Sequence, residues 1–494
     1  MRKEDIMNKK KLIAGLLAAV LVFSLTACAG GGNTSKGANG NLPEIFWHDR
    51  GALTPDHKLV YEEVNKYLAE KIGATVKNVP IVGSEYNEKI QLLLASGEPF
   101  DLCFMSSGTQ YEIHSANKGF LDIEPYLDEY GKDLKTLVPE YILDAARING
   151  VLYAIPFYKD YAAETVYYYR TDLAEKYNLD FSKVKEFKDL EPILKTIKEN
   201  EPTIYPLVFN NNDTPFYDIT RFDKIPGGVV GCIDMDGDPT KIVNPFDTDK
   251  AKEYYKMMHS FYEQGFMRPE IATIDNNNDI NDEFMRQQDE LPYLVDQRNV
   301  TAKYKHSVLH LWEARLGTQN ARGAMMSLGR RAKNPEKAVE FLNLLNTDKY
   351  LRNLIAYGIE GKHWEPVGED FYKIPEGFKN LAETGYNTYV FTQGNKYITR
   401  MVEGTPADIY DKYKEFDENA IKSPALGFAF DPANVKSEYS AVSNVISEYM
   451  PSLLTGTADP DETLPKAMEK LKAAGVDKLL AEMQKQYDEW LKIK

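Results

Sequence analysis

The densest concentration of reactive side chains lies in the stretch YGIEGKHWE, Tyr357–Glu365. Glu360 and His363 stand three positions apart, a spacing that places two metal ligands on one face of a helix. Gly361 interrupts such a helix between them, and the sequence shows no further donors that would complete a metal site. We therefore predict an irregular loop, in which Trp364 either contacts a ligand or packs against the protein.

A second group combines a flat aromatic ring with three hydrogen-bonding side chains: Trp47, His48, Asp49 and Arg50 follow one another at the end of a short apolar run. A polar ligand with an apolar face requires this combination. The structural alternative is that Trp47 packs beneath the next helix and Asp49 caps a turn. Both interpretations stay open at this stage.

Other candidate contacts occur where a strand or a linker ends. They are Ser107, Tyr111, Tyr158, Asp160, Tyr161, Asp296, Arg298 and Trp312. Each has a structural alternative: a helix cap for the first two, linker packing for the next three, a solvated turn for the aspartate and arginine, and the core for the tryptophan.

The elements that must position these residues alternate between short strands and amphipathic helices. The predicted order is strand 44–47, helix 56–73, strand 75–79, helix 86–97 and strand 101–105. Alternation of this kind predicts a parallel sheet covered by helices on both faces. Ligands bind such sheets at the carboxyl ends of the strands, where the Trp47 group is expected.

A second α/β unit begins at 165–178, after the turn signal Asn149-Gly150. Its predicted companions are strands at 205–209, 291–295 and 324–328, and helices at 247–265, 334–345, 461–475 and 476–492. The last helix has an apolar stripe that includes Trp490, so we interpret this tryptophan as core.

The N-terminal segment predicts export. Three lysines precede the apolar run 12–25, which is too short to span a bilayer and is typical of a signal peptide. The letters LTAC end at Cys28 and resemble the lipobox of bacterial lipoproteins, which predicts a signal peptide at 1–27 and a lipidated Cys28. An ordinary cleavage site with an incidental cysteine is the alternative, and Met7 is a possible start. The Gly/Ser/Asn-rich stretch 28–42 predicts a flexible tether.

Composition narrows the function further. The formal net charge of −16 argues against a nucleic-acid partner and mildly against a strongly anionic ligand. Cys103 and Cys232 are the cysteines besides Cys28, and we predict two buried thiols rather than a disulfide. No apolar run after the first one approaches transmembrane length, and no cofactor is predicted.

Segments spread over most of the chain resemble the extracellular solute-binding lipoproteins of bacterial ABC sugar importers. The resemblance rests on LLASGEPFDLCFMSS (93–107), GFLDIEPYLDEYG (119–131), INGVLYAIPF (148–157), VYYYRTDLAEKYN (166–178) and AKNPEKAVEFLNLL (332–345). Two further stretches, 347–365 and the tail 426–490, resemble a subgroup with a C-terminal domain of unknown function. Trp364 stands where that subgroup more usually has tyrosine.

The resemblance implies a two-lobed α/β fold of the Venus flytrap type, with hinge crossovers and a helical C-terminal region. The first lobe would comprise 43–157 plus about 318–370, and the second 158–317 plus about 371–494. A carbohydrate, expected to be an oligosaccharide, would bind between the lobes of a monomer and pass to ABC permease subunits. Catalysis is not expected. The aromatic content of 12% agrees with a sugar ligand, because aromatic rings stack on sugar C–H faces.

Two other classes of function remain possible from the sequence. A secreted glycoside hydrolase needs two carboxylates about 5–10 Å apart, which an acidic chain could supply, although no segment looks like a hydrolase motif. A surface sensor or adhesin could use the same fold without a permease. The acidic loops DMDGDP and DNNNDIND lack the glycine and glutamate spacing of an EF-hand and are interpreted as solvated turns.

Overall fold

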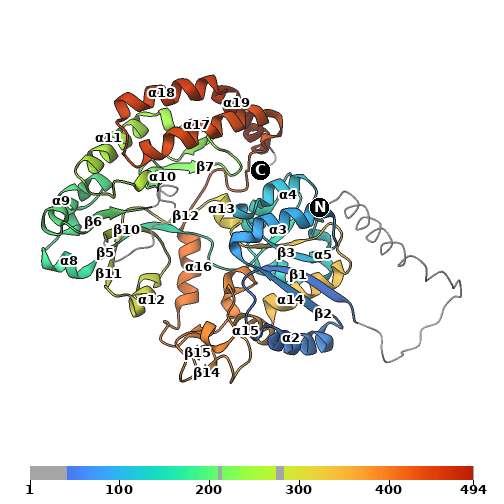
Figure 1. The fold of residues 1–494 in the computed structure, drawn as a ribbon. Coiled ribbons are helices and arrows are strands. Elements are labelled where there is room, and N and C mark those ends of the chain that lie inside the picture. The colour runs from blue at the N-terminus through green and yellow to red at the C-terminus, as the bar shows by residue number, and fades with distance from the viewer. Residues whose placement is uncertain (1–41, 210–213, 274–282, 493) are drawn as a thin grey trace, which may run out of the picture. The chain divides into compact units, whose positions relative to one another are not determined.

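The computed structural model describes residues 42–209, 214–273, 283–492 and 494. Leu42–Lys494 forms one unit, which contains two large hydrophobic cores. Each core is built around its own sheet (Figure 1). The predicted α/β, two-lobed arrangement is therefore present, and we call the part around each core a lobe.

The sheet of the first lobe has the strand order β2-β1-β3-β13-β4. Its strands are β1 (Glu44–Arg50), β2 (Thr75–Ile81), β3 (Leu102–Met105), β4 (Ala154–Pro156) and β13 (Met325–Leu328). The first three are parallel, as predicted, whereas β13 runs antiparallel to β3 and β4. The carboxyl ends of β1, β3 and β4 therefore lie at the same edge.

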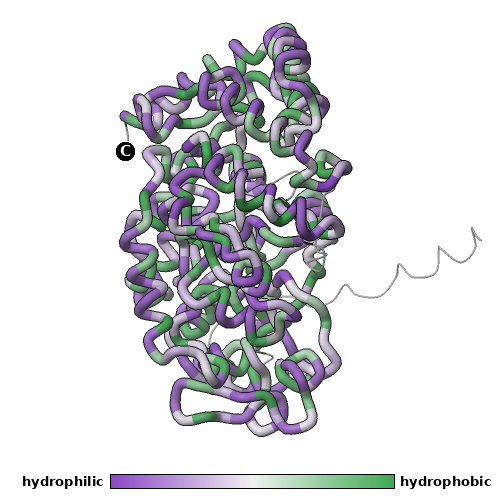
Figure 2. Tube along the Cα trace, turned by 90° about the vertical axis from the view of Figure 1, so that its left-hand side faces the viewer, coloured by the Kyte–Doolittle hydropathy of each residue, from purple (hydrophilic) through white to green (hydrophobic). Residues whose placement is uncertain are grey.

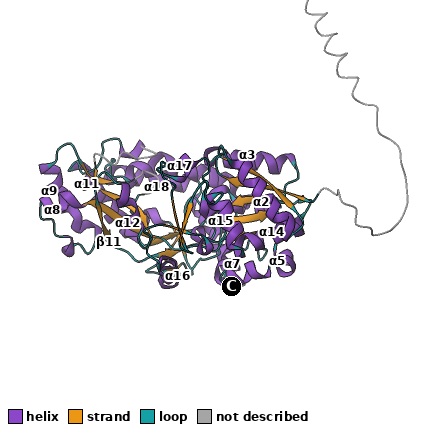
Figure 3. Cartoon of the chain, turned by 90° about the horizontal axis from the view of Figure 1, so that it is seen from below, coloured by secondary structure: helices purple, strands orange, loops and turns teal. Residues whose placement is uncertain are grey.

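Helices pack on both sides of this sheet (Figure 3). They are α2 (His57–Lys71), α3 (Gly83–Ser96), α4 (Tyr111–Ala116), α5 (Glu124–Tyr130), α6 (Lys132–Leu137), α7 (Glu140–Ala146), α14 (Pro335–Thr347) and α15 (Lys349–Tyr357). The apolar positions Val60, Val64 and Leu68 of α2 recur every four residues and are fully buried. Gly97 ends α3 in the left-handed conformation, with φ 67°. Such a helix end favours glycine.

The sheet of the second lobe has the order β11-β5-β10-β6. Its strands are β5 (Glu164–Arg170), β6 (Tyr205–Val208), β10 (Glu283–Glu290) and β11 (His306–His310). Strand β10 is parallel to β6, and both β10 and β11 are antiparallel to β5. The carboxyl ends of β10 and β11 thus meet the amino end of β5 at one edge.

The rest of the second lobe is mainly helical. Its helices are α8 (Thr171–Lys176), α9 (Glu191–Asn200), α10 (Phe216–Thr220), α11 (Asp249–Glu263), α17 (Lys436–Leu454), α18 (Pro460–Ala473) and α19 (Val476–Trp490), and a small sheet contains β7 (Phe222–Lys224), β8 (Cys232–Asp234) and β9 (Ile242–Val243). Trp490 packs against this second core, as predicted. Helix α17 had no counterpart among the predicted elements.

Three chain segments cross between the two cores. Ala163 pairs with Arg315 by mutual backbone hydrogen bonds, and β12 (Arg315–Leu316) pairs with β17 (Ile421–Lys422). The Asp417 carboxylate of α16 (Ile409–Asn419) accepts hydrogen bonds from the backbone N–H groups of Tyr161 and Ala162. The crossings are therefore tied to one another and to α16.

Residues 358–413 lie in neither large sheet and contribute to two smaller hydrophobic clusters, one that includes Trp364 and one that includes Met401. They contain β14 (Glu365–Val367), β15 (Phe371–Lys373) and β16 (Met401–Val402), which make a three-stranded sheet. The predicted boundary assigned everything after about residue 370 to the second lobe, whereas Tyr386 and Ala420 contribute to the first core. The short helix α13 (Thr318–Ala321) follows the second crossing.

The described residues test several expectations about local structure. The predicted strand 291–295 is wrong, because the strand ends at Glu290 and α12 (Leu294–Thr301) begins within that segment. Cys103 and Cys232 are buried free thiols, as predicted. In the loop DMDGDP, the Asp234 carboxylate forms an ion pair with Lys250, whose Nζ atom lies 2.7 Å away. The loop DNNNDIND lies outside the described residues.

The described part of the chain has no helix that is both long and apolar enough to cross a membrane. Figure 2 shows hydrophilic and hydrophobic residues interspersed along its trace. The predicted signal peptide, Cys28 and most of the tether precede the described residues.

Candidate functional site

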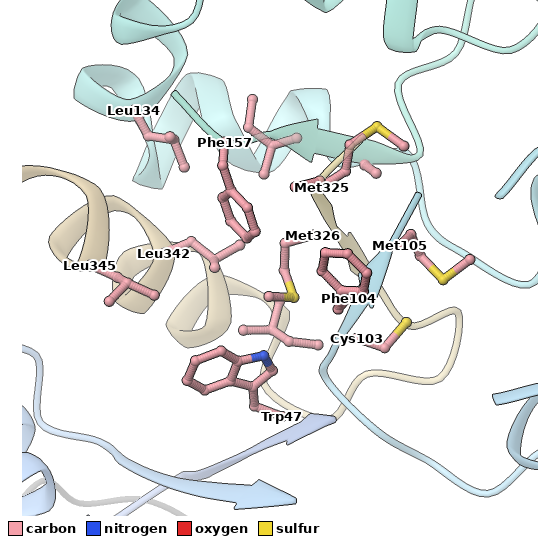
Figure 4. Packing of buried hydrophobic residues seen from close by; sticks show 14 of the residues in the cluster. Trp47, Cys103, Phe104, Met105, Leu134, Phe157, Met325, Met326, Leu342 and Leu345 are labelled. Atoms are coloured by element: carbon pink, nitrogen blue, oxygen red, sulfur yellow. The ribbon is translucent and has the colours of Figure 1, made fainter. Parts of the chain in front are cut away.

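Strand β1 sends its side chains alternately into the core and toward the surface. Trp47 is 0% exposed and lies in the same core cluster as Met326 and Leu342 (Figure 4). Its ring centroid is 5.6 Å from that of Phe341. The predicted ligand platform is therefore corrected to a core residue. A ring enclosed on both faces offers no surface on which a ligand can stack.

Asp49 is likewise directed inward, with an exposed fraction of 2%. Its carboxylate accepts hydrogen bonds from Gln393 Nε2 at 2.7 Å and from the backbone N–H of Arg50 at 2.8 Å. Burial raises the pKa of this carboxyl to about 7. We therefore assign Asp49 a role in attaching the segment around Gln393, a correction to the predicted ligand contact. His48 and Arg50 stay partly exposed.

Two residues follow the carboxyl end of β3. The hydroxyl of Ser107 donates to Glu112 Oε1 at 2.7 Å and remains partly exposed. Tyr111 is fully buried and its hydroxyl donates to the carbonyl of Ala146 at 2.9 Å. Of this pair, only Ser107 has surface available to a ligand, and the prediction for Tyr111 is corrected because its ring lies inside the core.

The first crossing begins with Tyr158, Asp160 and Tyr161. Tyr158 is partly exposed, and its ring lies edge-on to that of Tyr397 at 4.7 Å. Asp160 forms an ion pair with Lys396. Tyr161 is 3% exposed and donates its hydroxyl hydrogen to the carbonyl of Phe157. Tyr158 and Asp160 keep some exposed surface but line neither of the two cavities described below, so their roles stay predictions, whereas Tyr161 packs in the core.

A carboxylate pair lies at the facing edge of the second sheet. Glu164 and Glu290 are direct partners across β5 and β10, and both are buried. Like charges in such a position repel, so each needs its own compensation. His310 Nδ1 lies 2.8 Å from Glu164, while Tyr168 donates its hydroxyl hydrogen to Glu290.

Two cavities flank the second crossing. The Trp312 cavity, about 480 Å³, is lined by Glu164, Pro292, Trp312, Glu313, Ala314, Lys412, Glu415, Phe416 and Asn419. The Arg315 cavity, about 220 Å³, is lined by polar residues that include Thr165, Asp218, Asp223, Lys224, Asp289, Glu313, Arg315, Gln319 and Asn320. Glu313 lies on the wall of both. The first cavity has the size and the mix of aromatic and polar groups typical of small-molecule sites.

The remaining predicted contacts are not brought to these cavities. Asp296 and Arg298 are exposed on α12, where the Arg298 guanidinium lies 5.2 Å from the ring centre of Tyr168. Trp364 is 3% exposed and its indole N–H donates to the carbonyl of Gly358 at 2.9 Å. Trp364 is thus corrected to a packing residue, which was its stated alternative. Trp312 lines the larger cavity, so it is the predicted tryptophan that remains a candidate.

Several polar residues of the site were not predicted, namely Glu164, His310, Glu313 and Glu415. Glu164 and His310 are 146 positions apart, and no local pattern marks either one. The signal that could have found Glu313 is its place beside Trp312 in the segment LHLWEARLG.

The sequence matches known proteins over nearly its whole length. Residues 51–351 match the profile of the bacterial extracellular solute-binding proteins. The chain belongs to this family. Residues 424–492 match a domain of unknown function (DUF3502), which corresponds to the C-terminal subgroup expected from the tail. Members of the family bind solutes and do not transform them, so the hydrolase alternative is set aside.

Relatives include a carbohydrate ABC transporter substrate-binding protein of Streptococcus pneumoniae serotype 4, 34% identical over 98% of this chain and 99% of that protein. Lipoprotein LipO of Bacillus subtilis is 21% identical over 97% of this chain and 98% of its own. The solved N-glycan transport solute binding protein (NgtS) of S. pneumoniae superposes with a TM-score of 0.83 at 31% identity, covering 91% of this chain and 99% of that one.

Proposed function

We propose that this protein is a lipid-anchored receptor that captures an oligosaccharide between its two lobes and delivers it to an ABC permease. The observation that carries the proposal is the Trp312 cavity. It lies beside the second crossing and combines an aromatic ring with carboxylate, amide and ammonium groups. Sugars present apolar C–H faces to aromatic rings and hydroxyl groups to such polar atoms.

The position of the cavity supports a receptor whose lobes close on the ligand. Trp312 and Glu313 come from the second crossing, Glu164 from the start of β5, and Glu415 from α16. A ligand that contacts all three segments would favour the arrangement of the crossings to which it binds most tightly. The closed arrangement is the form that the permease would recognise.

Comparison with NgtS structures agrees with this mechanism. The superposition gives a TM-score of 0.83 with the structure whose name mentions no ligand. It gives 0.74 with the Man1GlcNAc complex and 0.71 with the Man5GlcNAc complex of the same protein. A ligand-linked change in lobe arrangement would produce such a difference.

The anchor and the permease complete the proposal. The LTAC lipobox predicts that Cys28 carries lipid, and two acyl chains give durable attachment where a single chain is marginal. The relationship to lipoprotein LipO supports this assignment. We propose that the receptor is a monomer. Replacing Cys28 with alanine is expected to release the protein from the membrane fraction into the medium.

Calorimetric titration tests the ligand class. Purified protein lacking residues 1–28 would be titrated with mannose- and N-acetylglucosamine-containing oligosaccharides, with fructo-oligosaccharides and with peptides. We expect saturable binding to at least one oligosaccharide series, and a rise in Tm that grows with the logarithm of ligand concentration. Binding of peptides with no response to any glycan would overturn the proposal.

A further inference from the structure

We propose that the site is selective for uncharged glycans and rejects their sialylated or uronate-bearing counterparts, with Glu313 as the central determinant. This inference rests on the proposed function and specifies its substrate class. It comes from the charges that line the two cavities and from the way in which the second crossing separates them.

Glu313 lies on the wall of both cavities. The backbone of Arg315 is fixed by two hydrogen bonds to Ala163, at 2.8 and 3.1 Å, and Leu316 continues into the pairing of β12 with β17. Trp312 lies on one side of Glu313 and faces the larger cavity, whereas Arg315 lines the smaller one. Any glycan longer than one sugar that fills both cavities must pass the Glu313 carboxylate.

Carboxylates outnumber cations on the combined walls. The acidic residues are Asp218, Asp223, Asp289, Glu313, Glu164 and Glu415, and the basic residues are Lys224, Arg315 and Lys412. Burial raises the pKa of Asp223, and the balance stays negative even when this carboxyl is left out. The negative net charge of the whole chain, −16, adds to the same field.

Two of the three cations are already engaged by the protein, and the third is engaged only in part. Lys412 Nζ lies 3.1 Å from Asp408, and Lys224 Nζ lies 3.9 Å from the ring centre of Tyr217. Arg315 interacts electrostatically with Asp223, but its buried Nη2 atom has no hydrogen-bond partner among the described residues. A carboxylate on the ligand would therefore meet walls on which carboxylates predominate, with Arg315 as the one wall cation that could offset the repulsion. Neutral hydroxyl groups can donate hydrogen bonds to the wall carboxylates.

Arg50 is a further cation that could attract an anionic ligand. Arg50 is partly exposed at the carboxyl end of β1, and within the described residues no carboxylate forms an ion pair with its guanidinium. An anionic branch that reached this rim could be attracted instead of rejected. Arg50→Gln and Arg315→Gln therefore belong among the variants.

The decisive experiment uses three forms of one glycan: a galactose-terminated N-glycan, its sialylated counterpart, and the sialic acid methyl ester, which keeps the size but removes the charge. Affinities would be measured at low and high salt. We expect the sialylated form to bind at least tenfold more weakly than the neutral glycan and the ester to recover most of that loss. Because salt screens exposed charges, the gap should narrow at high ionic strength.

Variants locate the effect. Glu313→Gln is expected to reduce the ratio of neutral to sialylated affinity severalfold, whatever it does to the neutral-glycan affinity itself, and Glu360→Gln, an exposed change in the loop Tyr357–Glu365, should leave both affinities unchanged. Equal affinity for the neutral and sialylated forms would overturn the inference, and so would an ester as weak as the acid, which indicates exclusion by size. Tighter binding of the sialylated form, abolished by Arg50→Gln or by Arg315→Gln, would also overturn it. A lack of binding to every glycan would contradict the proposed function itself.

Discussion

The Nε2 atom of His363 lies 3.1 Å from Oδ2 of Asp56, 307 positions earlier in the chain. Its Nδ1 atom accepts a hydrogen bond from the backbone N–H of Ile359 at 2.8 Å, so the proton of the neutral ring sits on Nε2 and is donated to Asp56. Burial lowers the pKa of His363, which favours this neutral form. The reactive-looking stretch Tyr357–Glu365 is thus an irregular loop, as predicted, that is fastened to the start of α2.

Removing this imidazole should destabilise the fold without changing the ligand site. His363→Ala leaves the Ile359 N–H without its partner at a site where the side chain is 0% exposed. The cost of an unsatisfied buried donor predicts a loss of about 2 kcal/mol in the free energy of unfolding, measurable by urea denaturation. Glu360→Gln in the same loop is exposed and should stay within about 0.5 kcal/mol of wild type. A loss of glycan affinity in folded His363→Ala would contradict this division of roles.

The two tryptophans Trp47 and Trp312 should behave in opposite ways. Trp47→Ala opens a cavity in the first core and should lower stability by about 3–5 kcal/mol. Trp312→Ala should weaken sugar binding by about tenfold or more, since stacking on a partly exposed ring is lost. Denaturation and calorimetry on each variant separate the effects. Unchanged affinity in a folded Trp312→Ala protein would remove this residue from the site.

The strands that could be predicted from the sequence are those in which the buried residues are apolar. The segment 102–105 is a continuous apolar run, and all four of its residues, which form β3, are buried. Strand β10 escaped prediction because its letters EFMRQQDE look polar, although Glu283 is buried through an ion pair with Arg286 at 2.5 Å. The apolar residues that follow were mistaken for the strand. Tyr293, with φ 71°, breaks the extended chain there.

The candidate site could be predicted only in part, because residues that are distant in the sequence come together in it. Ile45 and Trp47 are two positions apart in β1 and both face the core, but Phe46 between them is also apolar, so strand periodicity did not show which face would be buried. Glu164 and His310 belong to strands that pair only in the folded chain, and nothing nearby in the sequence links them. Family resemblance predicted a cleft between lobes, but which polar residues line it follows from the pairing of distant strands.

The contact between Glu164 and His310 predicts a pH-dependent contribution to stability. The Glu164 carboxylate raises the pKa of His310 above its ordinary value of 6.5. This contribution is fully present below pH 6.5, where the imidazole is charged in both states, and it is lost as the pH rises through the folded-state pKa. NMR titration of His310 should show a lower pKa in Glu164→Gln than in wild type. Identical titration curves would contradict the ion pair.

Asp49 should also make the free energy of unfolding decline as the pH rises, but for a different reason: burial favours the neutral form of its carboxyl group. Its pKa is raised from 3.8 to about 7 by burial, so the folded state binds the proton more tightly than the unfolded state. Stability attributable to this group is therefore highest at low pH and declines between about pH 4 and pH 7, by roughly 4 kcal/mol in total. Asp49→Asn removes the titration but keeps an oxygen and an amide next to Gln393, whose own amide can reorient. We expect the free energy of unfolding, measured by urea titration at successive pH values, to decline less in the variant. Parallel curves for wild type and variant across this range would show that the Asp49 carboxyl titrates normally and that Gln393 and the Arg50 N–H fully offset its burial.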